Sequence, residues 1–198
     1  SKRMLAVDNH KKWVEAAKFL GCDSIRVNAN GIGSREAVAT AAIKGLSLLA
    51  DYAIDYNINV IVENHGGFSS DGKWLVNVIE TTERDNIGTL PDFGNFCIRS
   101  KPAELTDWGS SVGGCAEEYD KYLGVKEMMP YARSVSAKTN NFDSNGNSVE
   151  TDYYKMLKII KDFGYKGYIS IEYEGEEYSE HEGILLTKQL LEKAGRNV

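Results

Sequence analysis

Acidic and basic side chains stand at the ends of several apolar stretches of this sequence, and chemistry is one reason to place them there. The stretch VIVENHGG (residues 60–67) passes from three β-branched residues directly to Glu63 and His65. A buried strand gains stability by staying apolar, and an unpaired carboxylate there costs several kcal/mol or shifts its pKa. Comparable changes occur at the ends of three later stretches, at Asp92, Lys138 and Glu172. The recurrence predicts a site assembled from strand ends.

The spacing within each stretch predicts which side chains share a face. Alternate residues of a strand point the same way, so Glu63 lies with His65, and Glu172 lies with Glu174. If the strands run parallel, the side chains that converge at one edge of the sheet are Glu63, Asp92, Lys138 and Glu172. Neighbouring carboxylates repel one another unless they share protons or bind a cation. The alternative is that each acid caps a loop or pairs with a lysine or arginine. That alternative explains a single acid well, but it explains four polar strand ends in register less well.

Apolar periodicity and turn residues predict the elements that carry this site. Strands are expected at residues 23–31, 58–65, 86–95, 131–139 and 165–175. Helices are expected at residues 9–21, 35–57, 71–84, 117–129, 151–164 and 181–195, with residues 96–116 as a long irregular stretch. About five strands, each followed by a helix, predict an α/β fold with a parallel sheet covered by helices.

Two architectures fit this alternation, an open doubly wound sheet and a (β/α) barrel, complete or partial. Both place function at the carboxyl ends of the strands. The glycine turn NGIGSRE (residues 30–36) lacks the third glycine of a dinucleotide fingerprint and the lysine of a phosphate-binding loop. It is therefore only a weak indication of nucleotide binding, and the better interpretation is a turn followed by a helix cap.

The composition limits the partners. The chain has 198 residues, 42% of them hydrophobic, which fits a single domain over residues 1–198. A formal charge of −6 without a basic run argues against nucleic acid. No apolar run approaches the roughly 18–20 residues of a membrane helix, so no membrane partner is expected. We expect a cytoplasmic protein, or a periplasmic one if a signal peptide was removed.

The cysteines are odd in number and form no C-x-x-C motif. Cys22, Cys97 and Cys115 read best as three free thiols in a reducing compartment. The alternative is a Cys97–Cys115 bridge across the long loop.

Four motifs in order, VIVENHGG, IGTLPDFGN, VSAKT and GYISIEYEG, resemble the xylose isomerase-like TIM barrels of the sugar phosphate isomerase/epimerase superfamily. The resemblance covers nearly the whole chain. It implies a TIM-type (β/α) barrel that is partial, with about five of eight βα units and the first three strands missing, because such barrels usually take about 250 residues. Open sheet edges and uncovered apolar surface would favour a homo-oligomer.

In that family a Glu, an Asp, a His and a final Glu from successive strands hold a divalent metal. Position by position, the resemblance implies Glu63, Asp92 and Glu172 as ligands, while the histidine position falls on Ser136. A second position that is often histidine in the family falls on Asn95. A set of oxygen ligands suits Mn²⁺ or Mg²⁺ better than Zn²⁺ and predicts weak binding.

The resemblance also implies a reaction. A sugar or sugar-phosphate isomerase or epimerase would abstract a proton next to a carbonyl, stabilise an enediolate with the metal and reprotonate it. Glu63 and Glu172 would be the catalytic pair, with pKa values raised toward neutrality by burial, while Asp92 stays ionised. The residues expected to bind substrate are His65, Lys138, Trp108 and Asn95. Trp108 would close over the sugar ring or, alternatively, form a small core of its own loop.

Other functions fit the same strand ends. A non-catalytic or metal-free sugar-binding barrel is favoured by Ser136 and Asn95, and a keto-sugar lyase or hydrolase would use the same site. Nuclease relatives of the family need a histidine-rich zinc site and a basic surface. Three histidines and a negative net charge argue against that reading.

Overall fold

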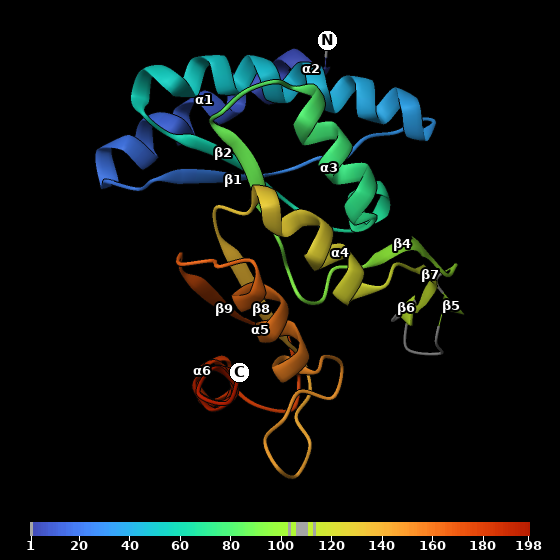
Figure 1. Cartoon of the computed structure of the whole chain (residues 1–198). Helices are drawn as coiled ribbons and strands as arrows, with labels where there is room; N and C mark the ends of the chain where they lie inside the picture. The colour runs from blue at the N-terminus through green and yellow to red at the C-terminus, as the bar shows by residue number, and fades with distance from the viewer. Residues whose placement is uncertain (1, 103, 106–110, 113) are drawn as a thin grey trace.

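Helices and strands alternate along the chain in the computed structural model, which describes residues 2–102, 104–105, 111–112 and 114–198 (Figure 1). The helices are α1 (Lys2–Leu20), α2 (Arg35–Ala53), α3 (Gly72–Thr81), α4 (Lys121–Met128), α5 (Tyr153–Asp162) and α6 (Glu180–Gly195). The strands between them are β1 (Ser24–Asn28), β2 (Asn59–Glu63), β3 (Ile87–Leu90), β8 (Val135–Thr139) and β9 (Ile169–Tyr173). All five expected strands and all six expected helices are present, so the α/β prediction is confirmed.

The five strands form two short parallel sheets. β1, β2 and β3 pair in sequence order, and β8 pairs with β9. Isolated parallel bridges, Thr89 to Ala132 and Asp92 to Ser136, join the end of β3 to the region of β8. The described residues form no closed barrel, and the expected row of five strands is interrupted between β3 and β8. The interruption follows from the shortness of β3, which Pro91 ends because proline cannot donate to a ladder.

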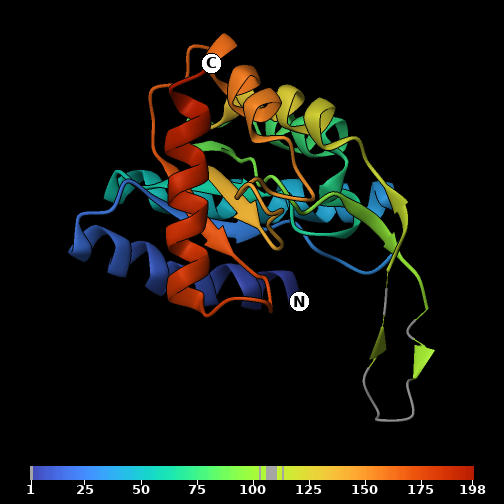
Figure 2. The ribbon, with the colours of Figure 1, turned by 90° about the horizontal axis from the view of Figure 1, so that it is seen from below.

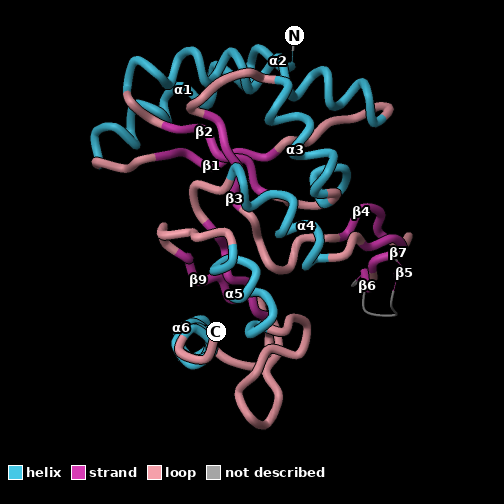
Figure 3. The backbone as a smooth tube through the Cα atoms, in the orientation of Figure 1, coloured by secondary structure: helices cyan, strands magenta, loops and turns pink. Residues whose placement is uncertain are grey.

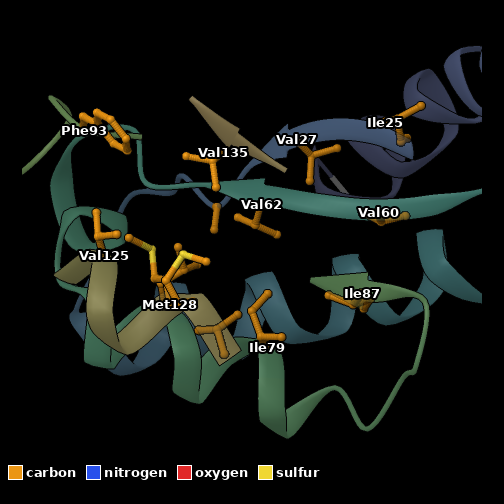
Figure 4. Close-up of a cluster of buried hydrophobic side chains, with 14 of the residues drawn as sticks. Ile25, Val27, Val60, Val62, Ile79, Ile87, Phe93, Val125, Met128 and Val135 are labelled. Atoms are coloured by element: carbon orange, nitrogen blue, oxygen red, sulfur yellow. The ribbon is translucent and has the colours of Figure 1, made fainter. Parts of the chain in front are cut away.

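The helices follow one another around the outside of the strands, and each packs against the next one along the chain (Figures 2 and 3). Val60 and Val62 are fully buried on the face of β2 that looks toward α3 and α4, with Ile79 and Met128 opposite (Figure 4). Alternation sends Glu63 to the other face of β2. The same strand therefore supplies the hydrophobic core on one side and an acid on the other.

The stretch 96–116, expected to be irregular, carries four short strands. β4 (Cys97–Ser100) pairs antiparallel with β7 (Cys115–Glu118), and β5 (Glu104–Leu105) pairs with β6 (Ser111–Val112). Figure 2 shows this arm projecting away from the rest of the chain. Trp108 lies outside the described residues.

A disulfide joins Cys97 to Cys115 at the base of the arm, with the two Cα atoms 5.6 Å apart. The prediction of three free thiols is therefore wrong for these two, and only Cys22 is free among the cysteines. The pairing of β4 with β7 brings the two sulfur atoms together, and that pairing is not readable from residue spacing alone.

One helical stretch contradicts the expectation that no segment is long and apolar enough for a membrane. Arg35–Tyr56, which comprises α2 and the following 3₁₀ turn, passes that test with a mean hydropathy of 1.4. Length and composition alone do not assign this helix to a membrane, because core helices pass the same test. Here Val38, Leu46 and Leu49 belong to the hydrophobic core of the domain.

Candidate functional site

Three carboxylates meet where β2, β3 and β9 end. Glu63 is the last residue of β2, Asp92 follows β3, and Glu172 lies in β9. Each offers one oxygen atom, and the three oxygens lie within 4.8 Å of one another. Glu63 and Asp92 are only 2% and 0% exposed. The structure thus brings together the three acids singled out as metal ligands, at one edge of the strands. We call them the carboxylate triad.

One oxygen of the triad has no hydrogen-bond partner. Asp92 Oδ1 accepts from the backbone N–H groups of Gly94 (2.9 Å) and Asn95 (3.0 Å). Asp92 Oδ2 is buried and unpartnered among the described residues. A buried, unpaired carboxylate oxygen is costly unless a proton or cation supplies the missing partner. This orphaned atom and an all-oxygen donor set fit a hard divalent cation.

The metal-free triad reverses the expected ionisation of its members. Burial raises the pKa of Asp92 to about 7, against the opposing charge of Lys138. Burial also acts to raise the pKa of Glu172, but the Ser136 hydroxyl, 2.8 Å from Glu172 Oε2, and the Lys138 ammonium outweigh it and lower that pKa. These two directions favour the ionised form of Glu172 and a retained proton on Asp92, the reverse of what was expected for these two acids.

Lys138 is buried inside the site and already paired. Its Nζ lies 2.9 Å from Glu174 Oε2, 3.4 Å from Glu172 Oε1 and 3.1 Å from Asn95 Oδ1. Burial acts to lower the pKa of this ammonium, but the neighbouring carboxylates outweigh it and raise the pKa. A substrate would meet Lys138 as a fixed cation. The interpretation that single acids pair with basic residues therefore holds in part.

Arg26 was not anticipated as a site residue. It lies in β1, on the same side as Glu63 because the β1–β2 register pairs Asn28 with Glu63. Its guanidinium donates a hydrogen bond to Glu63 Oε2 and forms an ion pair with it, while the Arg26 side chain stays 45% exposed. The signal available in the sequence was an arginine in the middle of SIRVN, an otherwise strand-like segment.

The remaining expected site residues divide into two groups. Asn95 lies in the site, where its Nδ2 is 3.5 Å from Glu63 Oε1, and Ser136 binds Glu172 as described. His65 is exposed on the loop after β2 and is held there by its backbone N–H, which donates to Ser69 Oγ. No hydrogen bond or ion pair joins His65 to the triad among the described residues. Its role in substrate binding stays a prediction.

The raised pKa of Asp92 predicts an unusual pH dependence. The folded chain binds this proton more tightly than the unfolded chain, whose Asp92 pKa is the ordinary 3.8. Unfolding free energy of the metal-free protein should therefore fall as pH rises from about 4 to about 7, by a few kcal/mol. Urea unfolding in EDTA across this range measures it. Asp92→Asn should abolish the slope, and an unchanged slope in that variant would assign it to other groups.

Comparisons with known proteins agree with this fold. A family profile described as xylose isomerase-like TIM barrel matches residues 1–194. No curated protein sequence matches the chain. The fold is similar to that of a D-tagatose 3-epimerase-like protein (TM-score 0.73, 19% identity), covering 99% of this chain and 70% of that one. It is also similar to the IOLI protein with a bound zinc atom (TM-score 0.71, 17% identity), covering 96% and 69%.

A third similar structure is a xylose isomerase-like TIM barrel protein from Mycobacterium smegmatis in complex with magnesium. Its TM-score is 0.64 at 15% identity, covering 96% of this chain and 65% of that one. Identities this low establish a shared fold and leave the chemistry to be argued from the site.

Proposed function

The chain belongs to the xylose isomerase-like TIM barrel family, and from this premise we propose that it is a sugar or sugar-phosphate isomerase or epimerase that works by proton transfer next to a carbonyl. The five parallel strands would correspond to consecutive units of the family's barrel. The observation that carries the proposal is the buried carboxylate triad with its unpartnered Asp92 oxygen. Proteins of similar fold that are described as sugar 3-epimerases support the same reaction class.

Glu63, Asp92 and Glu172 would hold a divalent cation, with Mn²⁺ or Mg²⁺ better matched than Zn²⁺ to a site without imidazole. When bound, such an ion polarises the substrate carbonyl and offsets the charge of the enediolate. The lowered pKa of Glu172 keeps this carboxylate ionised and able to accept a proton. Glu63, on a different strand, would return a proton to the other face of the carbon.

The other polar groups of the site would orient the sugar. Lys138 and Asn95 are buried or half-buried and present an ammonium and an amide beside the triad. Both groups can donate to hydroxyl or carbonyl oxygens, and Lys138 would also steady an oxyanion. Because Lys138 is already held by Glu172 and Glu174, it is preorganised and loses little freedom when a substrate binds.

A second function is favoured by a specific observation. Ser136 takes the place of the family's imidazole, and the Lys138 ammonium already supplies a positive charge 3.4 Å from Glu172. A metal-free sugar-binding barrel would need only such a hydroxyl and such a positive charge beside the carboxylates. A keto-sugar lyase or hydrolase would use the same groups with a different bond broken. The described triad contains no histidine, which disfavours a multi-zinc nuclease site.

Metal titration combined with proton exchange distinguishes these functions. The purified chain would be stripped with EDTA, titrated with Mn²⁺ and incubated with D-tagatose, other ketohexoses and their phosphate esters in D₂O. We expect Mn²⁺ binding and deuterium at the carbon next to the carbonyl. Sugar binding without metal or exchange would favour the binding barrel, and bond cleavage would favour a lyase or hydrolase.

Restoring an imidazole should strengthen the metal site. Ser136→His places a nitrogen ligand on the strand face that already contacts Glu172, so Mn²⁺ or Zn²⁺ affinity should rise by about tenfold or more. Isothermal titration calorimetry measures the change. The matched control is Ser134→His, two residues earlier on the same chain segment, which should leave affinity unchanged. If Ser136→His binds Mn²⁺ no more tightly than Ser134→His does, position 136 does not face the metal.

A further inference from the structure

We propose that Asn64 is a positioning residue of the carboxylate triad: its side-chain amide fixes the turn of residues 92–95 and so holds the Asp92 carboxylate beside Glu63 and Glu172. This inference rests on the proposed function, because it concerns cation binding at the same triad. Asn64 is the middle residue of the Glu-Asn-His segment, and its side chain reaches the backbone of the turn after β3. It is fully buried.

The amide of Asn64 makes three hydrogen bonds, all to one turn of backbone. Its Oδ1 accepts from the backbone N–H of Asp92 at 2.7 Å. Its Nδ2 donates to the carbonyl oxygens of Asp92 at 3.1 Å and Asn95 at 3.3 Å. Both polar backbone groups of Asp92 are thus held by a single side chain. The assignment of oxygen and nitrogen follows from these partners, since only Oδ1 can accept from an N–H.

The hydrogen bonds of the Asn64 amide continue the backbone hydrogen bonding of β2 and β3 beyond the end of their ladder. The last paired residues of β2 and β3 are Glu63 and Leu90, and Pro91 turns its backbone toward β8, where its carbonyl oxygen accepts from the Ser136 N–H. The Asp92 N–H is therefore the next donor that faces β2, and it meets the Asn64 side chain instead of a backbone carbonyl. A side-chain amide has the same donor and acceptor as a peptide group. Asn64 therefore extends the hydrogen-bonded connection of β2 to the β3 end by the two residues needed to reach Asp92.

The turn that Asn64 holds carries two groups of the site. Asp92 Oδ1 is tied to Gly94 and Asn95 N–H groups, which orients the carboxylate and leaves Oδ2 unpartnered. Asn95 directs its amide to Glu63 and Lys138. The Asn95 carbonyl oxygen also accepts a hydrogen bond from Ser70 Oγ at 2.8 Å, so two side chains, Asn64 and Ser70, hold the Asn95 end of the turn. At the other end of the turn, backbone hydrogen bonds to Ser136 hold Pro91 and Phe93. The N–H and carbonyl groups of Asp92 itself have no side-chain partner besides Asn64 among the described residues.

Metal affinity separates this positioning role from ordinary stabilisation. The variants are Asn64→Ala, which removes all three bonds, and Asn64→Asp, which keeps the acceptor for Asp92 N–H and loses both donors. The control is Asn86→Ala. Asn86 donates to the carbonyl oxygens of Ala50 (2.9 Å) and Ile58 (3.5 Å) at the opposite end of the same strands.

We expect both Asn64 variants to lose about 10–100-fold in Mn²⁺ affinity by calorimetry, the range typical of groups that orient metal ligands. Asn86→Ala should lose thermal stability and keep the wild-type affinity. Should Asn64→Ala not fold, Asn64→Asp and Asn64→Ser decide by the same criterion.

The outcomes separate this inference from the proposed function. Wild-type Mn²⁺ binding with equal affinity in a folded Asn64 variant overturns the positioning role and leaves the proposed function standing. An equal loss of affinity in Asn86→Ala also overturns it, because general destabilisation then explains the effect. A wild-type chain that binds no Mn²⁺ overturns the metal centre itself, together with the role of Asn64 toward it.

Discussion

Replacing Glu172 by glutamine is expected to lower the rate of proton exchange at the sugar carbon by about 10²–10⁴-fold, the usual contribution of a general base. Glutamine keeps the shape of the side chain and can still contact the Ser136 hydroxyl, but it cannot accept a proton from carbon. Ser136 and Lys138 lower the pKa of Glu172 against the effect of burial, which keeps this carboxylate ionised before the substrate binds. Glu172→Gln is therefore expected to lower the turnover rate.

Deuterium incorporation measures that defect directly. The wild type should introduce solvent deuterium into an active ketose or ketose phosphate, and Glu172→Gln should do so very slowly. Glu63→Gln should show a similar loss in exchange and also a loss in stability, because it leaves the Arg26 guanidinium without its carboxylate partner. The matched control is Glu176→Gln, an exposed acid in the loop just beyond β9. Full exchange in both site variants would exclude the two-carboxylate mechanism.

Asp92→Asn should abolish metal binding and at the same time stabilise the metal-free protein. The variant removes a charged ligand, so Mn²⁺ affinity should fall by more than the roughly 100-fold upper range for groups outside the ligand set. The same change removes the cost of ionising a fully buried carboxylate whose pKa is raised to about 7. Metal-free stability at pH 8 should rise by about 2 kcal/mol, or roughly 4–8 °C in Tm.

These two effects have opposite signs, and that is what makes the variant informative. In EDTA, the Tm of Asp92→Asn should exceed that of the wild type. Saturating Mn²⁺ should raise the Tm of the wild type and leave that of Asp92→Asn unchanged. The control is Asp143→Asn, in the turn after β8, where hydrogen bonds within its own loop lower the pKa of the carboxyl. That variant should lose a little stability and keep Mn²⁺ binding. Metal binding retained by Asp92→Asn would remove Asp92 from the ligand set.

Much of the architecture was readable from local pattern. The apolar runs and the helix cap expected after the turn of residues 30–36 predicted elements that the structure contains, with Ser34 as the cap of α2. The first helix ends next to Gly21, whose φ of +73° favours glycine. Residues 96–116 were misread because strands of two to four residues leave almost no periodic signal. The disulfide in this arm depends on the pairing of β4 with β7, a contact between residues 18 positions apart.

By itself the sequence determined that acids would gather where parallel strands end, because alternation within VIVENHGG and GYISIEYEG fixes the face on which Glu63 and Glu172 lie. It also determined the donor types, with serine at position 136 in place of an imidazole. Only the tertiary structure decided what those acids meet: Arg26 on Glu63, Lys138 between Glu172 and Glu174, and nothing on Asp92 Oδ2. The reason is physical. Side-chain direction is a local property of a strand, whereas desolvation and ion pairing depend on which distant residues surround a carboxylate, and these set its pKa and its readiness for a proton or a metal.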